Sequence, residues 1–267
     1  MPQMQFWPNK RILKRVAAHL RTGREGAPPI LKALGALPFL AIAMLPSPVT
    51  ADELVGGWEG GPHNGYGFAS PTFAIPLTHG NEAIIKPTAG YLYYDYRDAG
   101  GVTNVTEPKL SLEAGYRYSG ARVTATIGPM IEVLWERKVP QFGPHTDRTH
   151  VGAALAGDLY LQATRLTSLS LGASYDAIDR YSWGRASVKR RVTDLSFSAP
   201  FAVLVGAEVT GQGNKDVGQF GGGGIVEFAF DKGESSVQIH GGYSELSFSD
   251  HSTDSRPYIG VGLYHHF

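Results

Sequence analysis

From about residue 83 to its end, the chain alternates apolar side chains with small or polar ones. In the last eleven residues one alternating set is Ile259, Val261, Leu263, His265 and Phe267. The other set, from Tyr258 to His266, is small or amphipathic. Because a β-strand places alternate residues on opposite faces, this period predicts strands with two unlike faces. A terminal Phe267 in such a strand is typical of the closing strand of a bacterial outer-membrane barrel.

The same alternation delimits eleven candidate strands, at residues 66–75, 83–96, 110–118, 122–136, 150–162, 168–176, 180–192, 201–210, 219–230, 237–244 and 258–267. Several run to roughly 10–14 residues, longer than the usual soluble strand of about 5–6 and suited to a tilted membrane strand. Single-chain bacterial barrels have an even number of strands. We therefore predict about twelve strands, with ten as the alternative.

The N-terminal region has the features of an export signal. Seven Lys and Arg residues and one acid precede or flank an apolar run at 34–45, which ends before small residues at 49–51. We predict a cleaved signal peptide over 1–51 with a long basic n-region; an uncleaved anchor helix is the alternative. The Gly-rich stretch 52–65 is predicted as a flexible lead-in, and 66–267 as the barrel.

Composition narrows the function classes. The chain has no Cys, which excludes a disulfide scaffold and a Cys-ligated metal site. Outside residues 1–51 there remain 24 − 7 = 17 basic and 24 − 1 = 23 acidic residues, so no basic footprint for nucleic acid is present. No apolar run after Ala51 reaches transmembrane-helix length, so a membrane-embedded chain must cross as strands.

A soluble β-sandwich would also alternate, but its outward face would be rich in Lys, Glu and Thr. Here the non-apolar face is rich in Gly, Ala, Ser and Tyr, which suits a confined lumen. Aromatic residues also gather near strand ends, as interface girdles require. The predicted girdle is Tyr91, Tyr93, Tyr94, Tyr96, Trp135, Tyr175, Tyr181, Trp183, Phe228 and Phe230. We predict an all-β, antiparallel, up-and-down transmembrane β-barrel.

The polar face, if it points inward, brings charged groups into the lumen. These candidate lumen residues are Glu113, Arg117, Arg122, Glu132, Asp158, Asp176, Arg185, Lys189, Glu208, Glu227 and His240. One interpretation is that they pair across the barrel and plug it, because buried charges need partners. The other is a hydrated path or polysaccharide-contacting surface, with Tyr160, Tyr181 and Trp183 as stacking faces for sugar rings.

Catalysis would require a nucleophile, a base and an orienting group in contact. His240 and Ser244 share a face but stand about 13 Å apart along a strand. No Gly-x-Ser-x-Gly elbow occurs. The neighbouring His265 and His266 face opposite ways, which disfavours a metal site. We therefore predict no catalytic, cofactor-binding or metal-binding residues, with a lipid-modifying barrel enzyme as the lesser alternative.

Three segments resemble the cellulose biosynthesis protein BcsS family. They are Gly157-Asp158-Leu159, the stretch 174–185 with Arg180-Tyr181-Ser182-Trp183-Gly184-Arg185, and the stretch 206–214. The Tyr-rich segment 90–97 is also similar, so the resemblance covers roughly 66–267. It implies an outer-membrane β-barrel linked to cellulose production or export, and it carries no established catalytic residues.

Together these observations predict a non-catalytic outer-membrane barrel that serves cellulose or another exopolysaccharide. A general small porin or structural barrel is the alternative. The expected partners are outer-membrane lipid, the barrel assembly machinery and cellulose or cellulose-synthesis components, with no nucleic acid.

Overall fold

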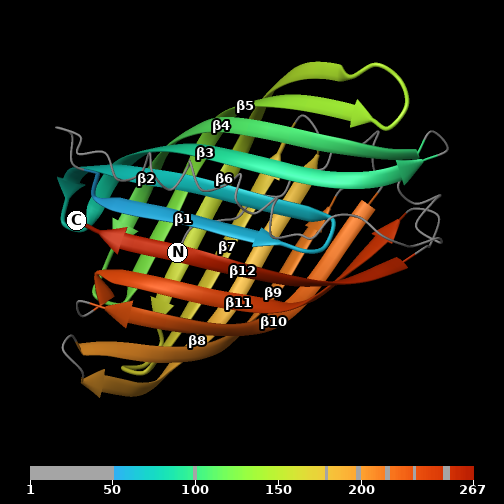
Figure 1. Cartoon of the computed structure of the whole chain (residues 1–267). Coiled ribbons are helices and arrows are strands. Elements are labelled where there is room, and N and C mark those ends of the chain that lie inside the picture. Colours follow the sequence, from blue (N-terminus) through green and yellow to red (C-terminus); the bar gives the residue numbers. More distant parts are fainter. Residues whose placement is uncertain are drawn as a thin grey trace.

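The computed structural model is a closed barrel of twelve antiparallel strands, described for residues 51–98, 101–177, 180–196, 200–213, 217–230, 233–248 and 253–267 (Figure 1). The strands are β1 (Glu53–Gly60), β2 (Asn64–Thr78), β3 (Asn81–Asp98), β4 (Gly101–Ser119), β5 (Val123–Pro140), β6 (Thr146–Gln162), β7 (Thr167–Asp176), β8 (Tyr181–Ser196), β9 (Pro200–Gly213), β10 (Val217–Phe230), β11 (Ser235–Phe248) and β12 (Thr253–His266). The predicted fold class and the favoured strand number are confirmed.

Each strand pairs with its sequence neighbours, and β1 pairs with β12 to close the ring. The closing register places Glu53 opposite His266 and Gly60 opposite Ile259. Beyond the last paired residue, the Phe267 amide donates a hydrogen bond to the Asp52 carbonyl oxygen at 3.0 Å. The C-terminal residue therefore ends the closing strand, as the alternation in 258–267 predicted.

The expected flexible lead-in at 52–65 is wrong, because β1 occupies Glu53–Gly60 and β2 begins at Asn64. This is the twelfth strand, which the alternation did not reveal. Gly56, Gly57 and Gly60 leave too few side chains to show a two-residue period, and the segment becomes a strand through its pairing with β2 and β12. The predicted signal peptide lies outside the described residues, apart from Ala51.

Large apolar side chains cover the outside of the wall. Ile131 is 62% exposed, Val151 67% and Ile259 58%, although all three lie within regular strands. Their in-strand neighbours Glu132 and Gly260 are buried on the other face. Apolar residues outside and polar residues inside are the pattern of a barrel whose outer surface contacts lipid. Among the described residues no helix is long and apolar enough to cross a bilayer, a finding that does not bear on crossing by strands.

Candidate functional site: the barrel lumen

The inner face of the wall gathers the charged residues predicted for the lumen. Nine of them occupy strands at inward positions and are buried or nearly so: Glu113, Arg117, Glu132, Asp176, Arg185, Lys189, Glu208, Glu227 and His240. Asp158 also points inward, toward Lys86. Arg122 was wrongly placed, because it lies in the exposed bend between β4 and β5. The polar run simply continued from the turn into β5, so alternation alone could not mark where the strand began.

One group of inward residues, which we call the histidine cluster, consists of Glu59, Arg185, Glu208, His240 and Tyr258. His240 Nδ1 lies 3.0 Å from Glu208 Oε1, and Tyr258 donates to the same oxygen at 2.9 Å. Arg185 contacts the other Glu208 oxygen and also His240. Glu59 Oε2 stands 3.7 Å from His240 Nε2. Five strands therefore contribute to one charged network, with the Glu208 carboxylate at its centre.

The wall is shaped to admit the His240 ring. His240 on β11 lies opposite Gly260 on β12. A Cβ atom built at Gly260 would overlap the imidazole ring of His240. Glycine at this position therefore lets the ring lie flat against the neighbouring strand, where it meets Tyr258 edge-on with ring centroids 6.2 Å apart.

A second group, the lysine cluster, lies on β3 to β6 and consists of Lys86, Lys109, Glu113, Glu132 and Asp158. Lys86 Nζ lies 2.7 Å from Glu113 Oε2 and 3.7 Å from Asp158 Oδ2. Lys109 Nζ lies 2.6 Å from Glu132 Oε2. The contact between Lys86 and Asp158 joins β3 to β6 past two intervening strands. Pairing of this kind offsets the high cost of burying single charges.

Further ion pairs reach past neighbouring strands in the same way. Arg117 on β4 makes two hydrogen bonds to Glu53 on β1, at 3.2 and 3.0 Å. The bidentate contact between Arg117 and Glu53 is of a kind that is geometrically specific as well as strong. Lys189 on β8 pairs with Glu227 on β10. The charges of the lumen thus tie non-adjacent strands together.

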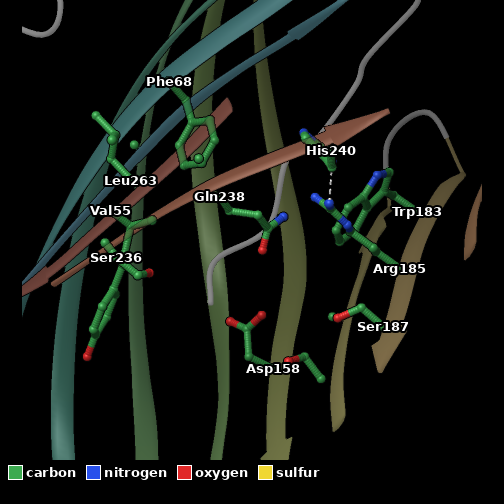
Figure 2. Close-up of a pocket in the computed structure, with 15 residues that line it drawn as sticks. Val55, Phe68, Asp158, Trp183, Arg185, Ser187, Ser236, Gln238, His240 and Leu263 are labelled. Atoms are coloured by element: carbon green, nitrogen blue, oxygen red, sulfur yellow. Dashed lines mark hydrogen bonds between the residues drawn. The ribbon is translucent and has the colours of Figure 1, made fainter. Parts of the chain in front are cut away.

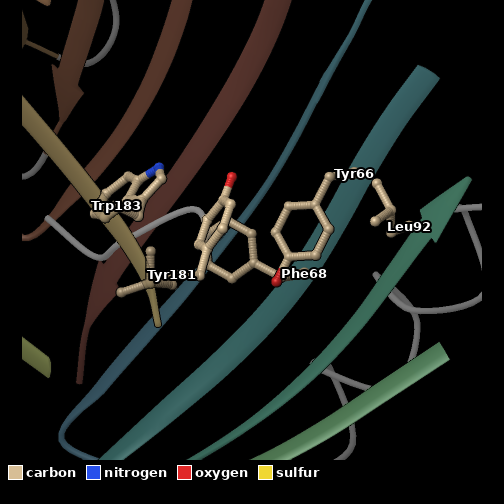
Figure 3. Packing of buried hydrophobic residues seen from close by; sticks show 6 residues of the cluster. Tyr66, Phe68, Leu92, Tyr181 and Trp183 are labelled. Carbon is tan, nitrogen blue, oxygen red and sulfur yellow. The ribbon is translucent and has the colours of Figure 1, made fainter. Parts of the chain in front are cut away.

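A third group of inward side chains, the aromatic layer, is apolar and aromatic. It comprises Val55, Tyr66, Phe68, Leu92, Tyr181 and Trp183, each at most 6% exposed. Tyr66 and Phe68 stand on β2, whereas Tyr181 and Trp183 stand on β8, six strands away around a ring of twelve (Figure 3). Residues from opposite walls therefore meet inside the barrel.

The aromatic layer corrects the predicted girdle. Tyr181 and Trp183 face the lumen, as the alternative interpretation of them as stacking faces predicted; at 3% and 6% exposure they cannot lie at the membrane interface. Trp135 and Tyr175 do lie on the outer face, at 41% and 46% exposure. Position near a strand end was the signal used for both pairs, but the parity of residues 181 and 183 matches that of the inward Arg185.

A cavity of about 70 Å³ lies beside the aromatic layer (Figure 2). Phe68 and Trp183 supply apolar walls, and Asp158, Arg185 and His240 supply polar ones. Three buried polar atoms of its lining residues have no hydrogen-bond partner among the described side chains: Asp158 Oδ1, Ser170 Oγ and His240 Nε2. A cavity of this size and polarity holds a few water molecules, which would be their partners.

Several inward residues were missed from the sequence. Glu59 lies in the unrecognised β1, and Tyr258 was assigned to the inner face without a role. Lys109 and Glu107 continue the parity of Ser111 and Glu113, but the candidate strand had been started at residue 110. Extending the two-residue period backward from Ser111 would have found both.

The arrangement can be compared with what catalysis needs. His240 directs Nδ1 to Glu208 and Arg185, so its ring is engaged in a charged network. Ser244, predicted from the sequence to be too distant to act with His240, is four residues farther along β11 and opposite Arg256 and Gly221. Within the described part of the chain, no group of three or more His, Asp or Glu side chains has a metal-binding arrangement.

Comparison with known families identifies the process. A protein-family model described as "Cellulose biosynthesis protein BcsS" matches residues 54–267, which include nearly all of the barrel. The chain belongs to the BcsS family. The resemblance noted in the segments around Asp158, Trp183 and Glu208 is thereby confirmed, and its extent reaches back into β1 of this BcsS protein.

The chain is similar to several solved structures at low sequence identity. The β-domain of the Bordetella autotransporter BrkA has a TM-score of 0.51 and 12% identity, covering 82% of this chain and all of that one. LpxR from Salmonella typhimurium has a TM-score of 0.45 and 11% identity, covering 80% of this chain and 100% of that one. The NanC porin has a TM-score of 0.41 and 11% identity, covering 80% of this chain and 99% of that one. The BrkA comparison shows an outer-membrane type of barrel fold and nothing further.

No curated protein sequence matches this chain significantly.

Proposed function

We propose that this BcsS-family protein is a non-catalytic barrel of the bacterial outer membrane that serves cellulose assembly or export as a closed scaffold. The family match over residues 54–267 carries the proposal, because it assigns nearly the whole barrel to a cellulose biosynthesis family. The apolar outer wall supports residence in a membrane. Export would use the predicted signal peptide, and insertion would use the barrel assembly machinery acting on the strand that ends at Phe267.

The filled lumen supports a scaffold in preference to an open porin. Porin lumens are polar and water-filled. In this protein the aromatic layer joins β2 to β8, and the pair between Lys86 and Asp158 joins β3 to β6. A polysaccharide chain would have to displace these contacts to pass through. We therefore propose that the protein works through its outer and rim surfaces, in contact with cellulose or with components of its synthesis.

The engagement of His240 supports the non-catalytic role. A general base in a lipid-modifying enzyme would need a nucleophile within reach of its free nitrogen, directly or through one water. Among the described residues no hydroxyl is hydrogen-bonded to His240 Nε2, which lies 3.7 Å from Glu59 Oε2, and Nδ1 contacts Glu208. Replacement of His240 by Gln keeps a polar side chain of similar size. We expect this variant to retain cellulose output, whereas an enzyme using His240 as its base would lose activity by orders of magnitude.

The test is deletion of the gene in its own bacterium, with complementation by the full-length chain. The expected result is loss of cell-associated cellulose, restoration by the wild-type gene, and recovery of the protein in the outer-membrane fraction. Unchanged cellulose in the deletion strain would contradict the assigned process. Recovery of the mature protein in the soluble periplasm would contradict the assigned location.

A further inference from the structure

The β6 strand is longer than its neighbour β7 at the rim far from the chain ends. β6 pairs with β7 only from Ala154 to Gln162, where Ala154 lies opposite Asp176. On its other side β6 stays paired with β5 as far as Thr146. The Ala153 carbonyl still accepts a hydrogen bond from Ala177, so among the described residues the segment Thr146–Gly152 has one paired side and one side with no strand against it. We call this side the free edge. In Figure 1 the β5–β6 connection stands apart from the ends of the orange strands.

The hydrogen-bonding groups of the free edge can be assigned by alternation. The Ala177 amide donates to the Ala153 carbonyl oxygen at 3.1 Å, so the backbone groups of Ala153 point toward the β7 side. In an antiparallel ladder alternate residues point to the same side. The amides and carbonyls of Val151, Thr149 and Asp147 therefore point away from β5, toward the side on which no described strand lies.

The free edge lies in water. Unpaired backbone groups are not found facing lipid, because nothing in the hydrocarbon layer can satisfy them. The side chains agree, since Thr146, Asp147, Arg148, Thr149 and His150 are all exposed. On the outer face the change from Thr149 to Val151 marks where the apolar belt begins.

This edge has only part of the usual protection against pairing. Natural edge strands are blunted by Pro, by charged side chains, by bulges or by being very short. The segment Thr146–Gly152 carries Asp147 and the inward Arg148, but it contains neither Pro nor Lys, and its register with β5 is continuous. Its β-branched residues Thr146, Thr149 and Val151 favour the extended conformation. An edge of this length and regularity is a template for another strand.

A second copy of the chain in the same membrane cannot be that strand. Barrel strands tilt by about 35–45° from the membrane normal. Two copies related by an axis along the normal would present their edges crossing at twice the tilt, roughly 70–90°. Paired strands must be nearly antiparallel or parallel, with a twist of roughly 20–25°. The geometry therefore excludes pairing between the β6 edges of two copies in one membrane.

We propose that the free edge of β6 is a docking site for an extended segment of another protein, which adds to the barrel sheet as a strand. The side chains indicate its chemistry. Arg148 and His150 project on the inner side of the edge, and Thr149 and Val151 on the outer side. Directly opposite residues in an antiparallel pair interact, so acidic residues fit opposite Arg148 and β-branched residues fit opposite Thr149 and Val151.

The test uses the full-length mature barrel in lipid nanodiscs and a ten-residue peptide of alternating Val and Glu as the probe. Amide hydrogen exchange is measured at residues 147–151. In the free protein we expect fast exchange at Asp147, Thr149 and Val151, and slow exchange at Arg148 and His150. Saturating peptide should slow amide exchange at Asp147, Thr149 and Val151 by at least tenfold.

Two variants and their controls make the result specific. Thr149→Pro removes one amide from the open side, where Pro is tolerated, and should weaken peptide binding at least tenfold. Thr149→Ala keeps that amide and should bind within twofold of the wild type. If Thr149→Pro does not fold, Arg148→Glu serves instead: it should weaken the Val–Glu peptide at least threefold and favour a Val–Lys peptide.

Protection of the three amides before any peptide is added would overturn the proposal, and so would an absence of protection by the peptide. Equal binding by all variants would also overturn it. Cellohexaose serves as the competing probe. Slowed exchange with cellohexaose and not with peptide would assign the edge to polysaccharide and contradict the polypeptide partner.

Discussion

The inner and outer faces of the barrel wall obey the same two-residue period but make different demands on the sequence. Glu208 faces inward, is 3% exposed and contacts Arg185, His240 and Tyr258. Its neighbour Val209 faces outward and is 48% exposed. The outer position needs an apolar side chain of any shape, because lipid adapts to it. The inner position needs one particular residue, because its partners come from several strands.

The largest expected effect lies inside, in a matched pair of neighbouring substitutions. Glu208→Ala leaves Arg185 and His240 without their shared carboxylate, and breaking a buried ion pair costs about 3–5 kcal/mol. Val209→Ala removes apolar contact with lipid and should cost only about 1–2 kcal/mol. Urea unfolding of both variants in bilayers measures the difference. Equal losses would show that the histidine cluster does not stabilise the barrel.

The next effect concerns charge on the outer wall at different depths. Leu171 lies near the middle of β7 and is 51% exposed, so Leu171→Arg should cost about 2–4 kcal/mol. Thr149→Arg, at the water-facing end of β6, should cost about 0–1 kcal/mol. The same unfolding assay compares them. Similar costs at both sites would place the membrane belt elsewhere on the wall.

The smallest effect on stability is expected at the C-terminal residue. The Phe267 side chain is 62% exposed, so Phe267→Ala should change unfolding in bilayers by no more than about 0.5 kcal/mol. If the assembly machinery reads this residue, the same variant should nevertheless reach the outer membrane several-fold less well in cells. Tyr243→Ala, at 69% exposure on the neighbouring strand, is the control. Equal assembly of both variants would contradict a signal at Phe267.

The contrast between the faces also explains what the sequence could reveal. The outer face repeats one chemical class, so the strands from Asn81 onward were recognisable and the fold class followed. β1 was not recognisable in this way, because glycines fill much of Glu53–Gly60 and leave few apolar side chains to alternate. The segment is a strand because it pairs with β2 and β12. The start of β5 could not be located from the alternation, because polar residues continue from the preceding turn into the strand. Arg122 was therefore predicted to face the lumen.

The sequence could predict which residues face the lumen, but not which of them contact one another. Parity placed Glu208, His240 and Arg185 inside, yet nothing in their spacing shows that they meet. Their contacts depend on the stagger between β8, β9 and β11, which is a property of the closed ring. Tyr181 and Trp183 show the same limit, because strand-end position suggested an interface and the closed barrel places them against β2.

The central claim is that the lumen is closed by its own side chains. The direct measurement is conductance of the purified full-length protein in planar bilayers, compared with Trp183→Ala, which removes one side chain of the aromatic layer. We predict no stable conductance steps for the wild type and measurable steps for the variant. Trp135→Ala, on the outer wall, should remain as silent as the wild type. Stable porin-like steps from the wild-type protein would contradict the claim.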